Sequence, residues 1–392
     1  MRTIAAILIT FLVRCVYLQP TGELDNIISD VSNALNLNRS CIFGPKSVSM
    51  VLFNSANPEG KNIGVEESCS NLNRSKPIVF LVHGFISSAN TTNTYDLASQ
   101  LVKKNYTVFS LDWSNAACDH GIPILRLLEY PQAVKNTREI GELMAKYVVS
   151  LIGECKIPLN NITFIGHSLG AHVCGFAAKL IQKSNLVKIS LIIGLDPAAP
   201  LFEFNKCEDR LCKSDATHVI TLHTSILGIP KPIGHVNLQY NDGKKQPDCS
   251  LIDIPCAHSK SIVYLANLLD NCVYPGVPTK LSILGLLQKP SYPESNTTDC
   301  IVVTDKIFDI KPSDKLREGT YYVFVEPKSP YCTRKNFSCK SLTINNKNEK
   351  KGAKESVPHL ERVVLSRRHM PHTVRRSSKN IGQVFIINNK LS

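Results

Sequence analysis

Four short apolar segments constrain the fold more than any other feature of this 392-residue sequence. They are rich in Ile, Val, Leu and Phe and are bounded by turn residues, and they are residues 78–82, 107–111, 161–165 and 189–195. Such runs are typical of strands buried on both faces of a parallel sheet. Helical patterns lie between them, as at 140–152 and 169–183. This alternation predicts an α/β fold with a mostly parallel central sheet and helices on both faces.

A Gly-x-Ser-x-Gly motif occupies residues 166–170 (Gly-His-Ser-Leu-Gly), between the third strand and the helix that follows it. A strand-to-helix turn of this kind raises the serine hydroxyl at the carboxyl edge of the sheet. The two glycines allow helix and strand to pack closely around a strained residue. The motif therefore predicts Ser168 as a nucleophile, and the alternative is a small-residue turn needed only for packing.

A serine nucleophile needs a histidine base and a carboxylate that orients the base, and hydrolases of this architecture place them in the order Ser, Asp, His. Asp196 directly follows the strand 189–195, so its carboxylate is expected at the same edge of the sheet as Ser168. Asp209 and Asp215 follow no strand and are weaker candidates. The sequence thus predicts Asp196 as the orienting carboxylate, against the alternative that it only begins a turn.

His258 is the predicted general base. It follows Cys256 and precedes an apolar helix expected over 261–269, so a disulfide at a helix start would hold its geometry. Six other histidines follow Asp196 and are interpreted as structural, loop or C-terminal residues: His218, His223, His235, His359, His369 and His372.

Backbone amides that stabilise a developing oxyanion should flank the nucleophile. Leu169 follows Ser168 at the positive end of a helix, and its amide is one candidate. Phe85 follows the strand 78–82, and Gly84 before it allows the backbone to turn. The Phe85 and Leu169 amides are therefore the predicted oxyanion hole, whereas His167 and His172 are interpreted as packing or hydrogen-bonding residues.

The N-terminus predicts secretion. A short basic start and the apolar run 4–13 are typical of a signal peptide, taken here as residues 1–19 with the cleavage site poorly defined, and no later stretch is long enough to span a membrane. Fourteen cysteines agree with an oxidising compartment. Asn161 opens a predicted buried strand and is not expected to carry a glycan. The predicted glycosylation sites are Asn38, Asn73, Asn90, Asn105, Asn296 and Asn336.

The positive charge is concentrated near the C-terminus. Residues 340–392 carry twelve Lys or Arg and three Glu, which accounts for nine of the thirteen net positive charges. The body of the chain therefore gives little reason to expect nucleic-acid binding. We expect a catalytic domain over 20–340 and a basic tail over 341–392, either disordered or a cleavable propeptide, that attracts anionic phospholipid surfaces.

Five motifs together resemble the animal pancreatic-lipase superfamily: 82–85 (Val-His-Gly-Phe), 111–113 (Leu-Asp-Trp), 166–172, 194–198 (Gly-Leu-Asp-Pro-Ala) and 256–258 (Cys-Ala-His). The resemblance covers roughly residues 40–340. Within the superfamily the chain looks most like insect phospholipase A1 of the wasp-venom-allergen type, through segments 113–118, 210–212, 223–225 and 321–330. The resemblance implies an α/β-hydrolase domain without the C-terminal lipid-binding β-sandwich of the pancreatic enzymes, because the segment after Pro330 is too short and polar.

Two local departures from the digestive lipases are informative. Cys249 and Cys256 enclose only six residues where triacylglycerol lipases carry a much longer lid. Leu251, Ile252 and Ile254 in this loop are predicted to dip into a lipid surface, and the alternative is a small disulfide loop packed inward.

The segment that corresponds to the calcium loop of the digestive enzymes is also altered. Arg210 and Asp215 have counterparts there, but two other ligand positions fall on Cys207 and Cys212. A disulfide would replace the ion, so no metal and no other cofactor is predicted.

Resemblance to the venom branch implies a disulfide between Cys41 and Cys118, and the short loops Cys207–Cys212 and Cys249–Cys256 are expected as well. Cys174, on the helix behind the serine, is the predicted free thiol. Four cysteines are expected to pair among themselves in an order that the sequence leaves open: Cys272, Cys300, Cys332 and Cys339.

These observations predict a secreted, monomeric phospholipase A1 that hydrolyses the sn-1 ester of glycerophospholipids at a membrane or micelle surface through an acyl-enzyme. A neutral triacylglycerol or galactolipid lipase is the enzymatic alternative. A lipid-binding protein of the insect yolk type is the other alternative, and the intact set of Ser168, Asp196 and His258 argues against it.

Overall fold

The computed structural model describes residues 48–118, 123–184, 188–250, 253–279, 290–294 and 299–344. The chain divides into two compact units, residues 1–345 and 346–392, and all described residues belong to the first. The predicted signal peptide and nearly all of the predicted basic tail lie outside the described residues. Within the described ranges, no helix is both long enough and apolar enough to span a membrane.

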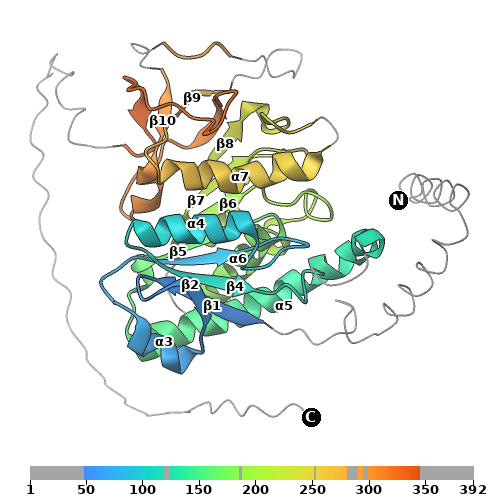
Figure 1. Cartoon of the computed structure of the whole chain (residues 1–392), viewed down its shortest axis with the longest axis vertical. Helices are drawn as coiled ribbons and strands as arrows, with labels where there is room; N and C mark the ends of the chain where they lie inside the picture. The colour runs from blue at the N-terminus through green and yellow to red at the C-terminus, as the bar shows by residue number, and fades with distance from the viewer. Residues whose placement is uncertain are drawn as a thin grey trace, which may run out of the picture. The chain divides into compact units, whose positions relative to one another are not determined.

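The strands of the described residues join one twelve-stranded sheet in the order β12-β10-β9-β11-β8-β7-β6-β5-β3-β4-β1-β2 (Figure 1). The run from β4 to β11 is parallel throughout, and β1, β2 and β9 pair with their neighbours in the antiparallel sense. The strands are β1 (Ser49–Asn54), β2 (Asn57–Asn62), β3 (Ile78–Val82), β4 (Thr107–Asp112), β5 (Ile162–His167), β6 (Ile189–Leu195), β7 (Ala216–His223), β8 (Val236–Tyr240), β9 (Tyr274–Pro278), β10 (Ile301–Val303), β11 (Gly319–Val323) and β12 (Lys340–Ser341).

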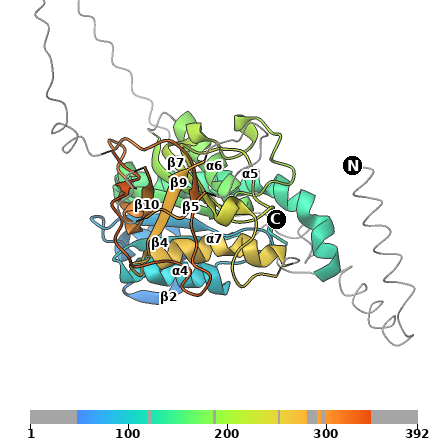
Figure 2. The same cartoon turned by 90° about the horizontal axis from the view of Figure 1, so that it is seen from above.

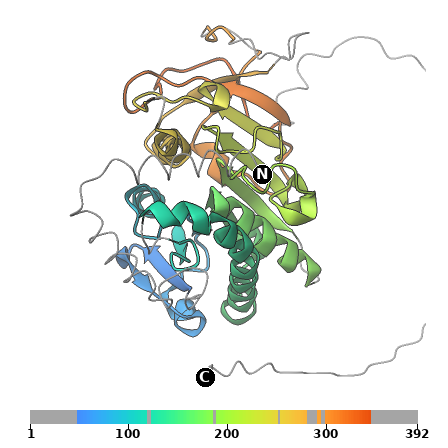
Figure 3. The same cartoon turned by 90° about the vertical axis from the view of Figure 1, so that its right-hand side faces the viewer.

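Helices cover both faces of this sheet. One face carries α4 and α7, which contact each other, and the other carries α3, α5 and α6 (Figure 2; Figure 3 gives a third view). The helices are α3 (Val65–Asn71), α4 (Thr92–Lys103), α5 (Pro123–Cys155), α6 (Leu169–Lys183) and α7 (Ile254–Leu268), with the 3₁₀ turns η2 (Leu159–Asn161), η3 (Cys207–Asp209), η4 (Lys213–Asp215), η5 (Asn241–Gly243) and η6 (Asp305–Asp309).

The sequence of β3 shows why both faces need cover. Ile78, Phe80 and Val82 point into the core beneath α5 and α6, whereas Val79 and Leu81 point into the core beneath α4 and α7. All five side chains are buried. Since successive side chains of a strand alternate between faces, a wholly apolar strand is stable only between two helical layers. The predicted α/β architecture is confirmed.

Three of the predicted elements begin and end at the residues expected from the sequence, and the bounds of two predicted strands differ slightly. β3, β6 and α6 have the predicted bounds, and β4 extends one residue further, to Asp112. β5 spans Ile162–His167 rather than 161–165, so Asn161 ends the turn η2 instead of opening the strand. The helix predicted over 140–152 is the second half of the long α5.

The helix predicted over 261–269 begins earlier, at Ile254, so that part of the prediction was wrong. The Asp253 carboxylate accepts a hydrogen bond of 3.0 Å from the Cys256 amide, and Pro255 lies in the first turn, where its missing N–H costs nothing. His258 is therefore part of α7 rather than of the loop before it.

The predicted end of the catalytic domain at residue 340 is also too early. Lys340 and Ser341 form β12 beside β10, and Leu342 is buried. The Arg317 amide donates to the Leu342 carbonyl at 2.9 Å, and Ile344 to Lys315 at 2.8 Å. The backbone pairs in the sheet although the side chains are polar, so composition alone placed the boundary too early.

Five disulfides tie the described residues together: Cys69–Cys155, Cys207–Cys212, Cys249–Cys256, Cys272–Cys332 and Cys300–Cys339. The structure thus supplies the order that the sequence left open, and it adds Cys69–Cys155, which sequence reasoning missed. Cys118 is disulfide-bonded, while Cys41, its predicted partner, lies outside the described residues. Cys174 is free and buried, as expected.

The predicted glycosylation sites within the described residues are all at the surface. Asn73, Asn90, Asn105 and Asn336 are exposed, as an acceptor asparagine must be. Asn38 and Asn296 lie outside the described residues, and glycosylation itself stays a prediction.

Candidate active site

Ser168 stands at the turn between β5 and α6 with an unusual backbone conformation, φ 55° and ψ −121°. A positive φ is strained for a residue with a side chain, and it persists only where the surroundings enforce it. The Ser168 amide donates to Leu195 at 2.9 Å, and its carbonyl accepts from Ala171 at 3.2 Å and from Ala198 at 3.3 Å. These bonds hold the serine against the end of β6.

Close packing around this turn explains its glycines. A Cβ atom on Gly170 would lie 2.3 Å from the Val82 carbonyl oxygen, so α6 could not approach β3 as it does. A Cβ atom on Gly84 would lie 2.7 Å from the Ser168 Cβ. The loop that follows β3, with the predicted oxyanion residue Phe85, therefore lies directly beside Ser168.

Asp196 and His258 form the central contact of the site. His258 Nδ1 lies 2.6 Å from Asp196 Oδ2, and the Asp196 side chain is fully buried. Asp196 directly follows β6, which pairs with β5, the strand before Ser168, and His258 comes from α7 on one face of the sheet. The structure thus joins two residues separated by 62 positions, in the arrangement that orients an imidazole as a base.

A second set of donors holds the Asp196 carboxylate, and sequence reasoning missed it. The Thr224 amide donates to Oδ1 at 2.9 Å, and the Ser225 hydroxyl donates to Oδ2. Gly228 packs against the same carboxylate, since a Cβ there would lie 2.3 Å from Oδ1. Their only sequence signal was the His-Thr-Ser segment at the end of β7, which carried a family resemblance but no chemical role.

These hydrogen bonds decide the charge of Asp196. Burial by itself would raise the pKa of this carboxyl group, but the hydrogen bond and positive charge of His258, with the bonds from Ser225 and Thr224, lower the pKa below its ordinary value. Asp196 therefore remains a carboxylate at neutral pH and can stabilise a positive imidazolium.

His167 contacts the candidate base without sharing its role. Its Nε2 lies 3.2 Å from the His258 carbonyl oxygen. Desolvation of the ring, followed by the charge of a protonated His258, lowers the pKa of His167 to about 3. A ring that stays neutral at working pH donates this hydrogen bond and steadies α7.

Hydrogen bonds of His83 hold the loop that carries the predicted oxyanion residue Phe85. The Trp113 amide donates to His83 Nε2 at 3.0 Å, and the Trp113 indole donates to the His83 carbonyl at 2.9 Å. His83 Nδ1 lies 3.0 Å from the Gly84 carbonyl oxygen, so the ring is bonded on both nitrogens. Among the described residues, none supplies an acceptor for the Phe85 or Leu169 amide, which leaves both free to bind a developing oxyanion.

The short loop closed by Cys249–Cys256 leads directly into α7 and so into His258. Ile254 is half-buried at the start of the helix. Leu251 and Ile252, the other two predicted lipid contacts, lie outside the described residues. The predicted lipid contact of this loop stays a prediction.

Lys179 binds two residues that the resemblance to the digestive lipases places in the calcium loop, Arg210 and Asp215. The Lys179 ammonium donates to the Asp215 carboxylate at 2.6 Å and to the Arg210 carbonyl at 2.8 Å. Its carbon chain comes from α6, and the loop it binds is the one closed by Cys207–Cys212. Asp215 is thus a structural carboxylate, and Asp209 forms a surface ion pair with Arg138.

We expect Lys179→Met to destabilise the protein by about 3 kcal/mol, because it leaves the buried Asp215 carboxylate without its cation. Urea unfolding followed by circular dichroism measures this. The matched control is Lys183→Met, an exposed position on the same helix, which should change stability by less than about 0.5 kcal/mol. Equal stability of the two variants would contradict the assigned role of Lys179.

The remaining described histidines near the site are bonded as structural residues. His172 links the Leu211 amide to the Ala198 carbonyl, and His223 Nε2 lies 2.8 Å from the Thr221 hydroxyl. His218 and His235 bond backbone groups as well. The structure therefore brings Asp196 to His258 and to none of these alternatives.

Comparison with known proteins agrees with this geometry. The Lipase family model matches residues 42–331. A protein named phospholipase A1 from Dinoponera quadriceps is 51% identical over 77% of this chain and 81% of its own length. Proteins of the same name from Solenopsis invicta (42% identical, 87% of this chain and 99% of that protein) and Vespula vulgaris (41% identical, 66% and 75%) are also similar. A strand-to-helix serine, a buried Asp–His pair and this match together show that the chain is a member of the lipase family.

Proposed function

We propose that this chain is a phospholipase A1, which hydrolyses the sn-1 acyl ester of glycerophospholipids with Ser168, His258 and Asp196 as its catalytic residues. The observation that carries the proposal is the 2.6 Å contact between Asp196 and His258 at the sheet edge where the strained turn presents Ser168. The names of the relatives at 41–51% identity support phospholipids as the substrate class.

The geometry supports a two-step acyl transfer. Ser168 Oγ attacks the ester carbonyl carbon while His258 Nε2 takes the hydroxyl proton, and the amides of Phe85 and Leu169 bind the oxyanion. The tetrahedral intermediate collapses when the C–O bond breaks and His258 returns the proton to the departing lysophospholipid. Water then attacks the acyl-serine, again losing its proton to His258, and the fatty acid leaves as Ser168 is regenerated.

Asp196 acts through His258 in both steps. It accepts the Nδ1 hydrogen bond, which fixes the tautomer and leaves Nε2 free to face the serine. Because its pKa is lowered, it is charged whenever His258 gains a proton. The carboxylate therefore stabilises the imidazolium that forms in each transition state.

A substrate panel tests the proposal. Full-length protein is assayed on phospholipids labelled separately in the sn-1 and sn-2 chains, on triolein and on a galactolipid. We expect release of the sn-1 chain in large excess. Preferential cleavage of triolein or the galactolipid would favour the lipase alternative, and no hydrolysis of any ester, with no labelling of Ser168 by a fluorophosphonate, would favour a lipid-binding protein.

Three exposed apolar side chains lie in the loops that follow β6 and β7, at the carboxyl edge that carries the catalytic residues. Leu201, Phe204 and Ile226 are 58%, 85% and 62% exposed. The Lys231 ammonium nitrogen lies 4.7 Å from the centre of the Phe204 ring, which adds a cation to the same surface. Such a surface suits contact with a phospholipid layer.

We expect Phe204→Ser to lower activity on phospholipid vesicles several-fold, because burying a phenyl ring in the lipid contributes about 1.5–3 kcal/mol at full burial. Activity on a water-soluble short-chain ester should stay unchanged. Leu143→Ser, at an exposed position on α5, is the matched control. Equal losses on vesicles and soluble ester would mean that Phe204 supports the site rather than the surface contact.

We further propose that the protein is secreted, which its five described disulfides and its exposed sequons support. The predicted signal peptide, glycans and monomeric state belong to this proposal. The predicted basic tail would add affinity for anionic membranes, and a truncation that tests it should follow Asn345, so that β12 is kept.

A further inference from the structure

Three side chains lie at hydrogen-bond distance from the backbone carbonyl oxygen of His258. His167 Nε2 lies 3.2 Å from this oxygen, Thr224 Oγ1 3.4 Å and Ser261 Oγ 3.0 Å. Ser261 belongs to α7, like His258 itself, whereas His167 ends β5 and Thr224 directly follows β7. The two donors from outside α7 therefore tie the backbone of the proposed base to the sheet edge that carries the nucleophile.

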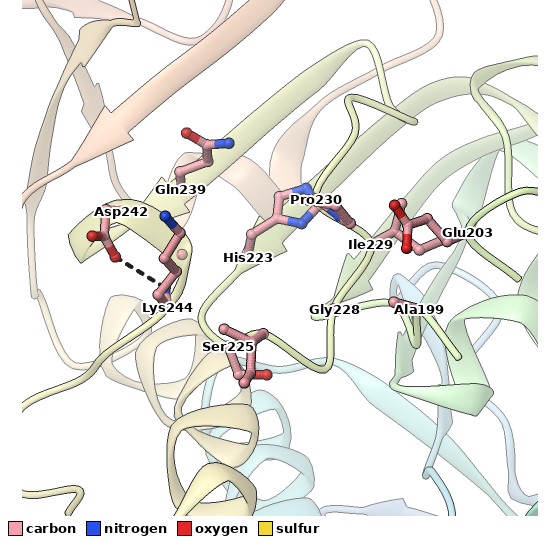
Figure 4. Close-up of a pocket in the computed structure, with 12 residues that line it drawn as sticks. Ala199, Glu203, His223, Ser225, Gly228, Ile229, Pro230, Gln239, Asp242 and Lys244 are labelled. Carbon is pink, nitrogen blue, oxygen red and sulfur yellow. Dashed lines mark hydrogen bonds between the residues drawn. The ribbon is translucent and has the colours of Figure 1, made fainter. Parts of the chain in front are cut away.

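Of these two donors, His167 has the shorter contact and the closer link to the nucleophile. Thr224 lies between His223 and Ser225, which line a cavity of about 390 Å³ at the sheet edge (Figure 4). Its hydroxyl contact, at 3.4 Å, is longer than a typical O–H···O hydrogen bond. His167 instead directly precedes Ser168, so one turn of the chain positions both the attacking oxygen and a donor for the base.

The alternation of side chains along β5 explains why His167 reaches α7. Ile165, two residues earlier, packs in the core beneath α4 and α7. Because every second side chain of a strand points to the same face of the sheet, His167 points to that face as well. The centre of its ring lies 4.5 Å from that of the His258 ring, with 46° between the ring planes. His167 therefore contacts both the backbone and the imidazole of the proposed base.

The other ring nitrogen of His167 faces the loop that carries the predicted oxyanion residue Phe85. A Cβ atom on Gly84 would lie only 3.3 Å from His167 Nδ1, so the ring lies between this loop and α7, close to both. A carbonyl oxygen can only accept a hydrogen bond, so the ring proton is on Nε2. Burial lowers the pKa of His167 to about 3, and at neutral pH no second positive charge opposes the imidazolium that His258 forms.

We propose that His167 is a positioning residue for ester hydrolysis, which donates a hydrogen bond to the His258 carbonyl and so fixes the distance between the base and Ser168. The inference rests on the proposed function, in which Ser168 is the nucleophile and His258 the base. Proton transfer between Oγ and Nε2 needs a heavy-atom distance of about 2.6–3.2 Å. A displacement of about 1 Å can cost about 100-fold in rate. The contact from His167 makes this distance depend on a single turn of the chain.

Three substitutions of His167 in the full-length protein separate the hydrogen bond from the ring and from polarity. Glutamine carries an amide N–H at about the reach of the histidine Nε2, asparagine carries one that is too short, and phenylalanine keeps a ring without a donor. We expect His167→Phe and His167→Asn to lower kcat on a water-soluble ester about tenfold or more, with KM within about twofold, because the base is displaced while substrate binding is kept. His167→Gln should keep kcat within about threefold of the wild type, because its N–H can still reach the carbonyl.

His235→Phe is the matched control for the loss of a histidine. His235 is half-buried like His167, and it also bonds a backbone group, since the Val219 amide donates to its Nδ1 at 3.0 Å. It directly precedes β8, which runs parallel to β5, so it lies at the sheet edge opposite Ser168. We expect its kcat to stay unchanged. Thermal unfolding of every variant is measured in parallel, so that each kcat refers to folded protein.

The outcomes separate this inference from the proposed function beneath it. Equal kcat values in His167→Phe and the wild type would overturn the role of His167, and so would a His167→Gln variant as slow as His167→Asn. In both cases a wild type that releases the sn-1 chain of phospholipids leaves the proposed function standing. If the wild type hydrolyses no ester, the proposed function fails and the role of His167 fails with it.

Discussion

Ser168→Ala is expected to reduce kcat on every ester substrate by roughly 10⁴- to 10⁶-fold, because the attacking oxygen is lost and nothing else forms the acyl-enzyme. The fold should survive, since alanine keeps the backbone bonds that hold the turn: the amide of residue 168 donates to Leu195, and its carbonyl accepts from Ala171 and Ala198. Rates on a water-soluble ester, with the thermal unfolding midpoint measured in parallel, test both expectations.

Ser225→Ala is the matched control for this loss. Its hydroxyl also lies beside His258, but it donates to Asp196 and cannot serve as the nucleophile while it does so. We expect a modest loss of rate with fluorophosphonate labelling retained. Labelling that survives in Ser168→Ala and disappears in Ser225→Ala would reverse the assignment of the nucleophile.

The second large effect is expected for Asp196→Asn, at about 10⁴-fold in kcat. An amide donates as well as accepts, so it favours the wrong tautomer of His258 and cannot stabilise the imidazolium by charge. Steady-state rates on the soluble ester measure the loss.

Asp215→Asn separates a catalytic carboxylate from a structural one. Asp215 is as buried as Asp196, but its partner is Lys179. We expect it to lower the unfolding free energy and to leave kcat of the folded fraction within a few-fold. A loss of rate in Asp215→Asn comparable to that in Asp196→Asn would contradict the present choice between these two aspartates.

The parts of the fold that could be predicted are those that a short stretch of neighbouring residues identifies by itself. β3 and β6 are apolar on both faces, so their bounds followed from composition alone. The serine turn combined a short motif with its place between a strand and a helix. Asp196 followed because it is the first carboxylate at the end of the next strand.

The parts that could not be predicted depend on contacts between distant segments. β12 consists of two polar residues, and it joins the sheet through backbone pairing with β10. Cys69 and Cys155 are separated by 86 positions and carry no spacing signal. The early start of α7 depended on one capping aspartate, Asp253, in a short loop whose apolar residues were interpreted as lipid contacts.

The supporting residues of the site show the same limit. Thr224, Ser225 and Gly228 matter because the loop after β7 wraps the Asp196 carboxylate. Their residue types are common in any turn. Lys179 had no predicted role, because only the fold brings its ammonium to the Arg210 and Asp215 oxygens.

The ion pair of Lys179 with Asp215 has a consequence for the fluids in which the protein keeps its structure. A diffusible ion holds a loop only while its concentration in the surrounding fluid exceeds its dissociation constant, and citrate, phosphate or a chelating protein can remove it. Lys179 is attached to α6 by its own covalent chain, so its local concentration near Asp215 is fixed by the fold. The loop between β6 and β7 should keep its shape in fluids that sequester divalent cations as readily as in those rich in them.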